Sequence, residues 1–157
     1  MSATGELASF VRRLDPGGLS DAVLRQAGRS ILDLTGVAIA GTRAPMAEIG
    51  ACFGSEQFAS GKCTVIGSRR PLCATGAAWV NCNAASALDL DDGHRMAMGH
   101  PGAAVIPAAL AVAETTGATG REFLAAVVAG YEVAVRASVA RVPWYKDRLY
   151  SSGIWGV

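Results

Sequence analysis

The feature that most constrains the fold of this chain is its abundance of residues with little or no side chain. Among the 157 residues, 30 are alanine and 19 are glycine, so 49 positions offer no bulky group to a core. Alanine is the strongest helix former, and helices with small residues at their contacts can pack closely. We therefore expect an all-α, bundle-like domain with at most one short strand-like segment.

Composition and charge exclude several classes of protein. Disorder is excluded because 51% of the residues are hydrophobic and only 17% are charged. The 14 Lys and Arg residues are balanced by 13 Asp and Glu residues, with no basic run to bind nucleic acid. No uninterrupted apolar stretch reaches the roughly 18 residues of a membrane span, and the start of the chain lacks the pattern of a secretory signal. We expect a cytoplasmic protein without nucleic-acid or membrane partners.

The four cysteines form no C-x-x-C pair, and only two histidines are present to complete a zinc site. Reduced thiols suit a cytoplasmic protein, although spacing alone leaves a disulfide framework open.

Turn signals divide the chain into segments with a helical spacing of apolar residues. A short apolar pattern in residues 1–14 stops at the Asp-Pro-Gly-Gly turn of residues 15–18. Ser20 is the predicted N-cap of the next helix, and Gly41 is its predicted C-cap. The other expected helices cover residues 46–53, with Gly54 as the stop, residues 71–88, with Pro71 in the first turn, and residues 101–114. Residues 63–67 are the one strand-like piece.

The last predicted helix follows a capping box formed by Thr119 and Glu122. It runs to near Pro143 and is apolar on more than one side, which is typical of a buried central helix. The chain then stops on apolar residues, where the start of another element would be expected rather than a frayed end. We therefore expect residues 1–157 to form a single helical domain that is the N-terminal part of a longer two-domain protein.

One stretch concentrates the groups that could do chemistry. Five acidic or imidazole side chains and one arginine occur within twelve residues, namely Asp89, Asp91, Asp92, His94, Arg95 and His100. If they end a helix, Asp89 and Asp92 share a face and repel, and the helix dipole disfavours both. Residues placed against local preference are candidates for function. A solvated helix end and a divalent-metal site are the alternatives, although the spacing does not match an EF-hand. We expect no metal or cofactor.

His100 directly precedes the helix that Pro101 opens. Free backbone N–H groups at a helix start attract an anion such as a substrate carboxylate, and Gly102 and Ala103 leave room for a ligand to approach. A neutral imidazole near an aspartate could move a proton at neutral pH. Arg95 could hold a carboxylate through paired hydrogen bonds. The alternative is that His100 only caps the helix.

Residues 85–94 (ASALDLDDGH) and 100–110 (HPGAAVIPAAL) resemble motifs of the MmgE/PrpD family, and residues 31–41 and 130–136 support the resemblance. That family includes 2-methylcitrate dehydratase, cis-aconitate decarboxylase and iminodisuccinate epimerase. The resemblance implies a helical domain that forms one wall of an active site, a second α+β domain and a homodimer. It also implies small di- or tricarboxylate substrates and no organic cofactor. Asp89 and His100 match the motif aspartate and histidine of the substrate pocket.

Two positions depart from the family pattern. Gly93 stands where a threonine is usual, and Tyr150 stands where a later histidine is expected. The chain is thus predicted to be a lyase, with a dehydratase favoured, or an epimerase that works by acid–base chemistry next to a carboxylate. The alternative is a non-catalytic, truncated helical paralogue that binds a protein partner. The expected catalytic residues are Asp89 and His100, then Asp92, His94 and Tyr150, and the expected substrate-binding residues are Arg95, Gly102, Ala103 and Ser152.

Overall fold

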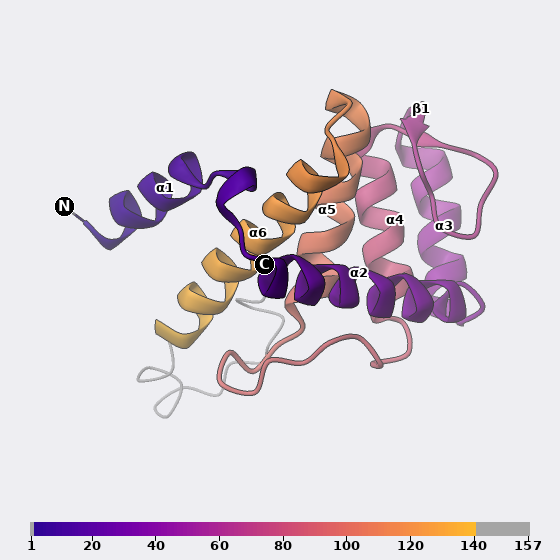
Figure 1. The fold of residues 1–157 in the computed structure, drawn as a ribbon. Helices are drawn as coiled ribbons and strands as arrows, with labels where there is room; N and C mark the ends of the chain where they lie inside the picture. The colour runs from indigo at the N-terminus through magenta and orange to yellow at the C-terminus, as the bar shows by residue number, and fades with distance from the viewer. Residues whose placement is uncertain (1, 141–157) are drawn as a thin grey trace.

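The computed structural model describes residues 2–140, which fold into six α-helices and one short strand (Figure 1). The helices are α1 (Ala3–Arg13), α2 (Asp21–Gly41), α3 (Pro45–Gln57), α4 (Ala74–Ser86), α5 (Pro101–Thr116) and α6 (Gly120–Ala140), with a 3-10 turn, η1 (Pro16–Gly18), and the strand β1 (Ser60–Cys63). The all-α prediction is confirmed. Tyr150 and Ser152 lie outside the described residues.

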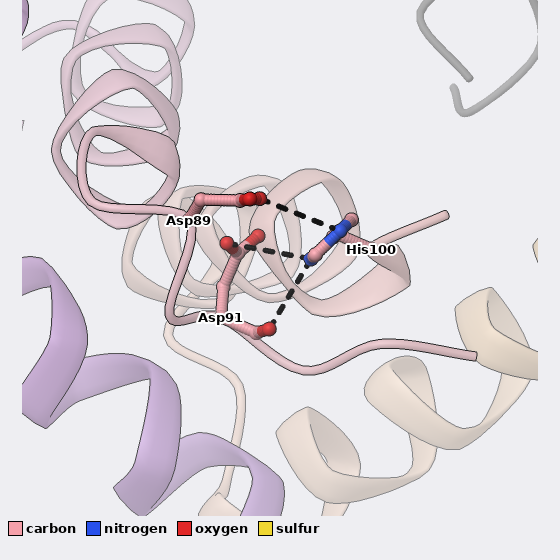
Figure 2. A group of neighbouring side chains, drawn as sticks. All are labelled: Asp89, Asp91 and His100. Carbon is pink, nitrogen blue, oxygen red and sulfur yellow. Dashed lines mark hydrogen bonds and ion pairs between the residues drawn. The ribbon is translucent and has the colours of Figure 1, made fainter. Parts of the chain in front are cut away.

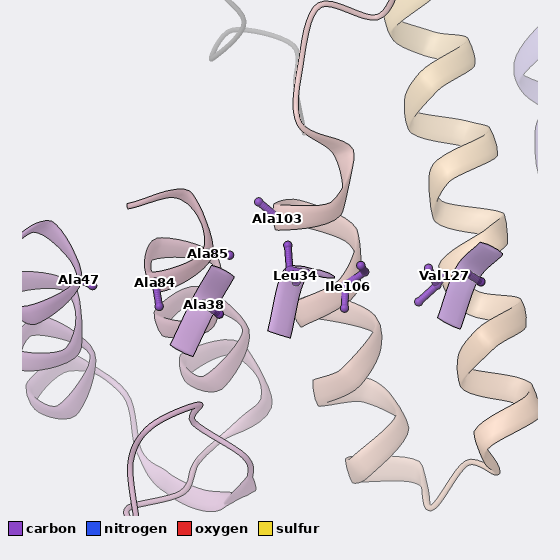
Figure 3. Packing of buried hydrophobic residues seen from close by; sticks show 9 residues of the cluster. Leu34, Ala38, Ala47, Ala84, Ala85, Ala103, Ile106 and Val127 are labelled. Atoms are coloured by element: carbon purple, nitrogen blue, oxygen red, sulfur yellow. The ribbon is translucent and has the colours of Figure 1, made fainter. Parts of the chain in front are cut away.

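The helices pack around α4 and α5. In Figure 1, α3, α4, α5 and α6 stand side by side, and α2 runs across them. The main core cluster contains nine buried residues, six of which are alanines; its larger members are Leu34, Ile106 and Val127 (Figure 3). A core built from alanine brings helix backbones close together, as the composition predicts.

Two glycines that were predicted to end helices instead mark contacts between helices. Gly41 is the last residue of α2, and a Cβ atom there would overlap the carbonyl oxygen of Ala84 in α4. Gly54 lies inside α3, which continues to Gln57, and a Cβ atom there would overlap the side chain of Val80. The predicted C-cap at Gly41 and the predicted stop at Gly54 are therefore wrong, because both positions serve close packing against α4.

The extended segment lies earlier in the chain than predicted. β1 forms isolated antiparallel bridges with Leu72, whereas residues 64–67 follow it as loop. Asn81 of α4 holds that loop, because its side-chain amide accepts from the backbone N–H of Ile66 and donates to the carbonyl of Thr64, each at 2.8 Å. A side-chain amide thus supplies the backbone hydrogen bonds of the segment that was predicted to be strand-like.

Helix α4 is shorter than predicted at both ends. It begins at Ala74 with Cys73 as its N-cap, so Pro71 does not lie in its first turn. Because Leu72 pairs with β1, the chain just before α4 is extended rather than helical. At the other end α4 stops at Ser86, and the acidic run therefore lies in the loop that leads to α5. The cysteines of the described chain are free thiols.

Helix α6 is not the buried central helix that was predicted. Its buried residues are Ala125, Val127 and Ser138, and it packs against α5 and α2. Much of the remaining surface borders an open, mostly apolar groove shared with α1. By length and composition, α6 is the one helix of residues 2–140 that could cross a membrane. It also carries the ion pair between Glu132 and Arg136, at 2.7 Å.

Candidate active site

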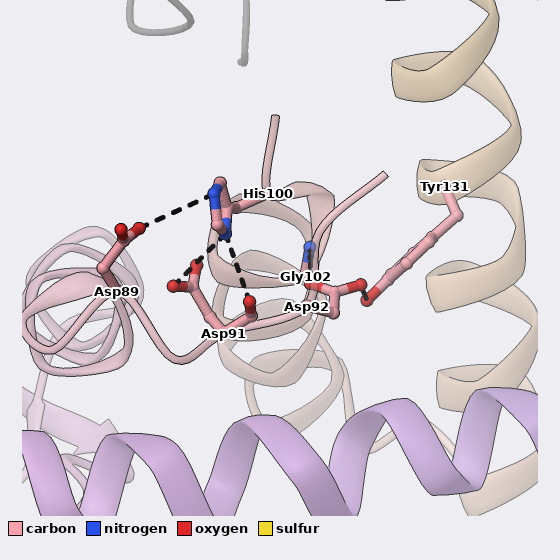
Figure 4. Close-up of polar contacts among 6 residues, drawn as sticks. All are labelled: Asp89, Asp91, Asp92, His100, Gly102 and Tyr131. Atoms are coloured by element: carbon pink, nitrogen blue, oxygen red, sulfur yellow. Dashed lines mark hydrogen bonds and ion pairs between the residues drawn. The ribbon is translucent and has the colours of Figure 1, made fainter. Parts of the chain in front are cut away.

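The candidate site lies in the loop that joins α4 to α5. Asp89 adopts a left-handed backbone conformation with φ of 54°, which aspartate tolerates better than most residues. Its N–H donates to the carbonyl of Ser86 at 3.3 Å, and the chain then leaves the axis of α4. Asp89 and Asp92 therefore do not share a helix face, contrary to the prediction. Each acidic side chain of the loop has different partners (Figure 4).

The imidazole of His100 lies close to the carboxylates of both Asp89 and Asp91, which stand on the same side of the ring in Figure 2. Nδ1 is 3.4 Å from Oδ1 of Asp91 and 3.2 Å from the backbone carbonyl oxygen of the same residue. Nε2 is 3.7 Å from Oδ1 of Asp89. The side chain of Asp89 is 90% exposed, whereas that of Asp91 is 2% exposed. One ring nitrogen therefore faces a buried acid, and the other faces an exposed acid.

Asp91 is a buried carboxyl group with incomplete hydrogen bonding. Its Oδ2 has no hydrogen-bond partner within the described part of the chain. Burial raises the pKa of the Asp91 carboxyl above its ordinary value. A hydrogen bond with its own backbone and the charge of His100 oppose this change, whereas the charges of Asp92 and Asp89 reinforce it.

Asp91→Asn is expected to raise the thermal midpoint at neutral pH. Because the pKa of Asp91 is higher in the folded chain than in the unfolded chain, ionisation of this group favours unfolding. The wild type therefore loses stability relative to the variant as the pH rises from the unfolded pKa, about 3.9, through the raised folded pKa. Thermal unfolding at pH 3 and pH 7 measures the difference. A gain of equal size at both pH values would contradict this account.

Asp92 ties the start of α5 to α6. Its Oδ1 accepts from the backbone N–H of Gly102 at 2.9 Å, and its Oδ2 accepts from the Tyr131 hydroxyl at 2.8 Å (Figure 4). The positive end of the α5 dipole favours a carboxylate at this position. A Cβ atom at residue 102 would overlap Oδ1 of Asp92, so glycine permits the contact. The N–H of Gly102 thus donates to an anion of the protein itself, and the adjacent Ala103 is buried.

Tyr131→Phe is expected to lower the free energy of unfolding by about 1.5–3 kcal/mol, the contribution of one hydrogen bond to a charged acceptor. Burial first, and then the hydrogen bond and charge of Asp92, raise the pKa of Tyr131, so its hydroxyl stays a donor. Phenylalanine keeps the ring and leaves Oδ2 of Asp92 without that donor. Urea unfolding at pH 7 measures the loss, and an unchanged midpoint would show that the bond contributes nothing.

His94 and Arg95 belong to a small hairpin in the same loop. The backbone N–H of His94 donates to the carbonyl of Gly99 at 2.8 Å, and its Nδ1 accepts from the N–H of Ala97 at 3.1 Å. Arg95 is exposed in this hairpin. One ring nitrogen of His94 therefore helps to close the hairpin, whereas the Arg95 side chain lies at the surface.

A comparison with known proteins identifies the family. A family model described as the MmgE/PrpD N-terminal domain matches residues 5–157. The chain belongs to the MmgE/PrpD family. It is also 31% identical over 146 residues to the cis-aconitate decarboxylase-like protein oryM of Aspergillus oryzae (strain ATCC 42149 / RIB 40). That match covers 88% of this chain and 30% of the relative. No solved structure matches the chain significantly.

Two residues of this MmgE/PrpD domain were not selected from the sequence. Asp91 stood in the acidic run, but nothing in the local pattern distinguished it from its exposed neighbour Asp89. Tyr131 lies 39 positions from its partner Asp92, on an apolar helix, and no spacing rule connects the two. Its hydroxyl, a polar group within an apolar stretch, was the only signal.

One ligand-type atom from each of Asp89, Asp91 and His100 lies within 4.8 Å of the others. The set thus has the spacing of a cation site as well as that of an acid–base site.

Proposed function

We propose that this domain supplies part of an active site that moves a proton next to a carboxylate of a small di- or tricarboxylate. The observation that carries the proposal is the position of His100, whose Nε2 lies near the carboxylate of Asp89 and whose Nδ1 lies near that of Asp91. Imidazole is the side chain whose ordinary pKa suits proton transfer near neutral pH. The imidazolium that forms when His100 accepts a proton would face two carboxylates, which favour a positive charge.

The chemistry begins with removal of a proton from the carbon next to a substrate carboxylate. Nε2 of His100 accepts the proton, and the electron pair left on carbon either expels a leaving group or is protonated again. Dehydration and epimerisation follow these two courses. A decarboxylation removes no proton from carbon: the carbon–carbon bond to the carboxylate breaks, carbon dioxide leaves, the electron pair stays on the substrate, and a protonated His100 donates one proton to it. Asp89, exposed on the Nε2 side, would share the proton transfer, and the exposed Arg95 would bind a substrate carboxylate.

The similar protein from Aspergillus oryzae is named for its likeness to cis-aconitate decarboxylase, which makes cis-aconitate the first substrate to test. Because the chain spans 30% of that relative, we assign the activity to the full-length protein rather than to residues 1–157 alone. The resemblance to the family also supports a homodimer as part of the proposal, and the cytoplasmic location stays an expectation from the sequence.

The experiment is to incubate the purified full-length protein with cis-aconitate, 2-methylcitrate and iminodisuccinate, and to follow each by proton NMR. We expect turnover of one of these substrates, and none with heat-denatured protein. A folded, monodisperse full-length protein that turns over none of the three would overturn the proposal.

A further inference from the structure

We propose that Asp91 sets the tautomer of His100, so that the proton of the neutral ring sits on Nδ1 and Nε2 remains free to act as the base. Asp91 would thus be a positioning residue that acts through His100 without touching the substrate. This inference rests on the proposed function, in which Nε2 of His100 moves the proton.

The contact between His100 and the backbone of Asp91 determines the direction of the hydrogen bond. Nδ1 lies 3.2 Å from the carbonyl oxygen of Asp91, and a carbonyl oxygen only accepts. The nitrogen must therefore carry the hydrogen. Oδ1 of Asp91, at 3.4 Å from the same nitrogen, adds a second acceptor on that side. Because a neutral imidazole has a single N–H, Nε2 is left with a lone pair, and this nitrogen lies 3.7 Å from Oδ1 of the exposed Asp89.

His94 provides an internal contrast. Its Nδ1 lies 3.1 Å from the backbone N–H of Ala97, and an N–H only donates. Nδ1 of His94 must therefore be the acceptor, which places the proton of the neutral ring on Nε2. The two histidines of the chain are thus expected to adopt opposite tautomers, although they lie in the same loop.

The burial of Asp91 supports a role in function rather than in stability. Its side chain is 2% exposed and its Oδ2 lacks a hydrogen-bond partner among residues 2–140. A carboxylate in that environment costs free energy that a neutral asparagine of similar shape would avoid. What the carboxylate adds is a negative charge beside Nδ1, where it stabilises the ring after Nε2 has accepted a proton.

The same tautomer argues against a cation held jointly by Asp91 and Nδ1 of His100. A nitrogen that carries a proton cannot bind a metal, so such a cation would have to displace the hydrogen bond at Nδ1. Nε2 keeps its lone pair and is the ring nitrogen left to take part in chemistry.

The first test is NMR of the protein labelled with ¹⁵N at histidine, at a pH where both rings are neutral. Long-range proton–nitrogen correlations distinguish protonated from bare ring nitrogens, and His94→Gln and His100→Gln assign the signals. We expect a protonated Nδ1 in His100 and a protonated Nε2 in His94. A protonated Nε2 in His100, or averaged shifts like those of free histidine, would overturn the inference.

The second test is the rate of Asp91→Asn in the full-length protein. The orienting aspartate of a Ser-His-Asp triad contributes up to about 10⁴ in kcat. Here the backbone acceptor remains in the variant, so we expect kcat to fall at least about tenfold, with KM changed less than about threefold and the thermal midpoint not lowered. The matched control is Glu48→Gln, which removes an exposed charge in the first turn of α3 and should leave kcat unchanged. An unchanged kcat in Asp91→Asn would contradict the positioning role.

The NMR result separates this inference from the proposed function, because it requires no turnover. If His100 shows the opposite tautomer while His100→Ala abolishes activity, the role of Asp91 fails and the proposed function stands. If the tautomers are as expected while His100→Ala keeps full activity, the proposed function fails, and the geometry at Asp91 has no catalytic use.

Discussion

Replacing His100 with alanine in the full-length protein is expected to lower kcat/KM by more than about 10²-fold, the lower end for general acid–base catalysis. The ring contacts both Asp91 and Asp89 in the described structure, and imidazole is the side chain whose ordinary pKa suits a base at neutral pH. Alanine leaves the two carboxylates in place without the imidazole that accepts and returns the proton. Steady-state kinetics on the substrate found for the wild type measures the loss.

The matched control for this prediction is His94→Asn. Asparagine can keep an acceptor for the N–H of Ala97, so the hairpin should close as before and kcat/KM should change less than about tenfold. Circular dichroism and thermal unfolding confirm that both variants are folded. A large loss of rate in His94→Asn together with a normal rate in His100→Ala would contradict the prediction, because it would identify His94 as the base.

Gly41→Ala is expected to lower the free energy of unfolding by about 3 kcal/mol, the upper end for overpacking a core. The new Cβ atom would overlap the carbonyl oxygen of Ala84, which is backbone and cannot rotate away. Helix α2 would have to move away from α4 and loosen the alanine contacts between the two helices. Urea unfolding followed by circular dichroism measures the change.

Gly36→Ala is the control in the same helix. No atom beyond its own helix and chain neighbours lies within 4 Å of a Cβ atom built at Gly36, so the substitution should stabilise the protein by up to about 1 kcal/mol through helix propensity alone. If the same Gly→Ala change lowers the free energy of unfolding at position 41 and raises it at position 36, the difference is due to the contact of Gly41 with α4. A change of the same sign and size at both positions would contradict the close-packing account.

The parts of the fold that follow from local sequence were predictable. Ser20 caps α2 by accepting from the N–H of Val23, and Thr119 and Glu122 form the expected capping box at the start of α6. The roles of Gly41 and Gly54 were not predictable. A glycine that ends a helix and a glycine that admits a neighbouring helix look alike in a single sequence, and only the packing partner distinguishes them.

In the candidate site, too, the residues could be found from the sequence but their contacts could not. The acidic and imidazole groups of residues 89–100 could be located from composition, because charge is sparse elsewhere in the chain. Their pairing could not, since it depends on the left-handed turn at Asp89, which sends Asp91 toward His100 and Asp92 toward Tyr131. The burial of α6 was overestimated because an apolar sequence does not show which neighbours cover it.

The most direct test of the central claim, that His100 moves a proton next to a substrate carboxylate, is solvent-isotope incorporation. The full-length wild type, His100→Ala and His94→Asn would each react in D₂O with the identified substrate or, for a dehydration, with its unsaturated product, so that the reverse hydration adds a deuteron. Mass spectrometry would follow deuterium at the carbon beside the carboxylate. We predict rapid incorporation by the wild type and by His94→Asn, and incorporation slowed more than about 10²-fold in His100→Ala. Incorporation by folded His100→Ala at the wild-type rate would contradict the account.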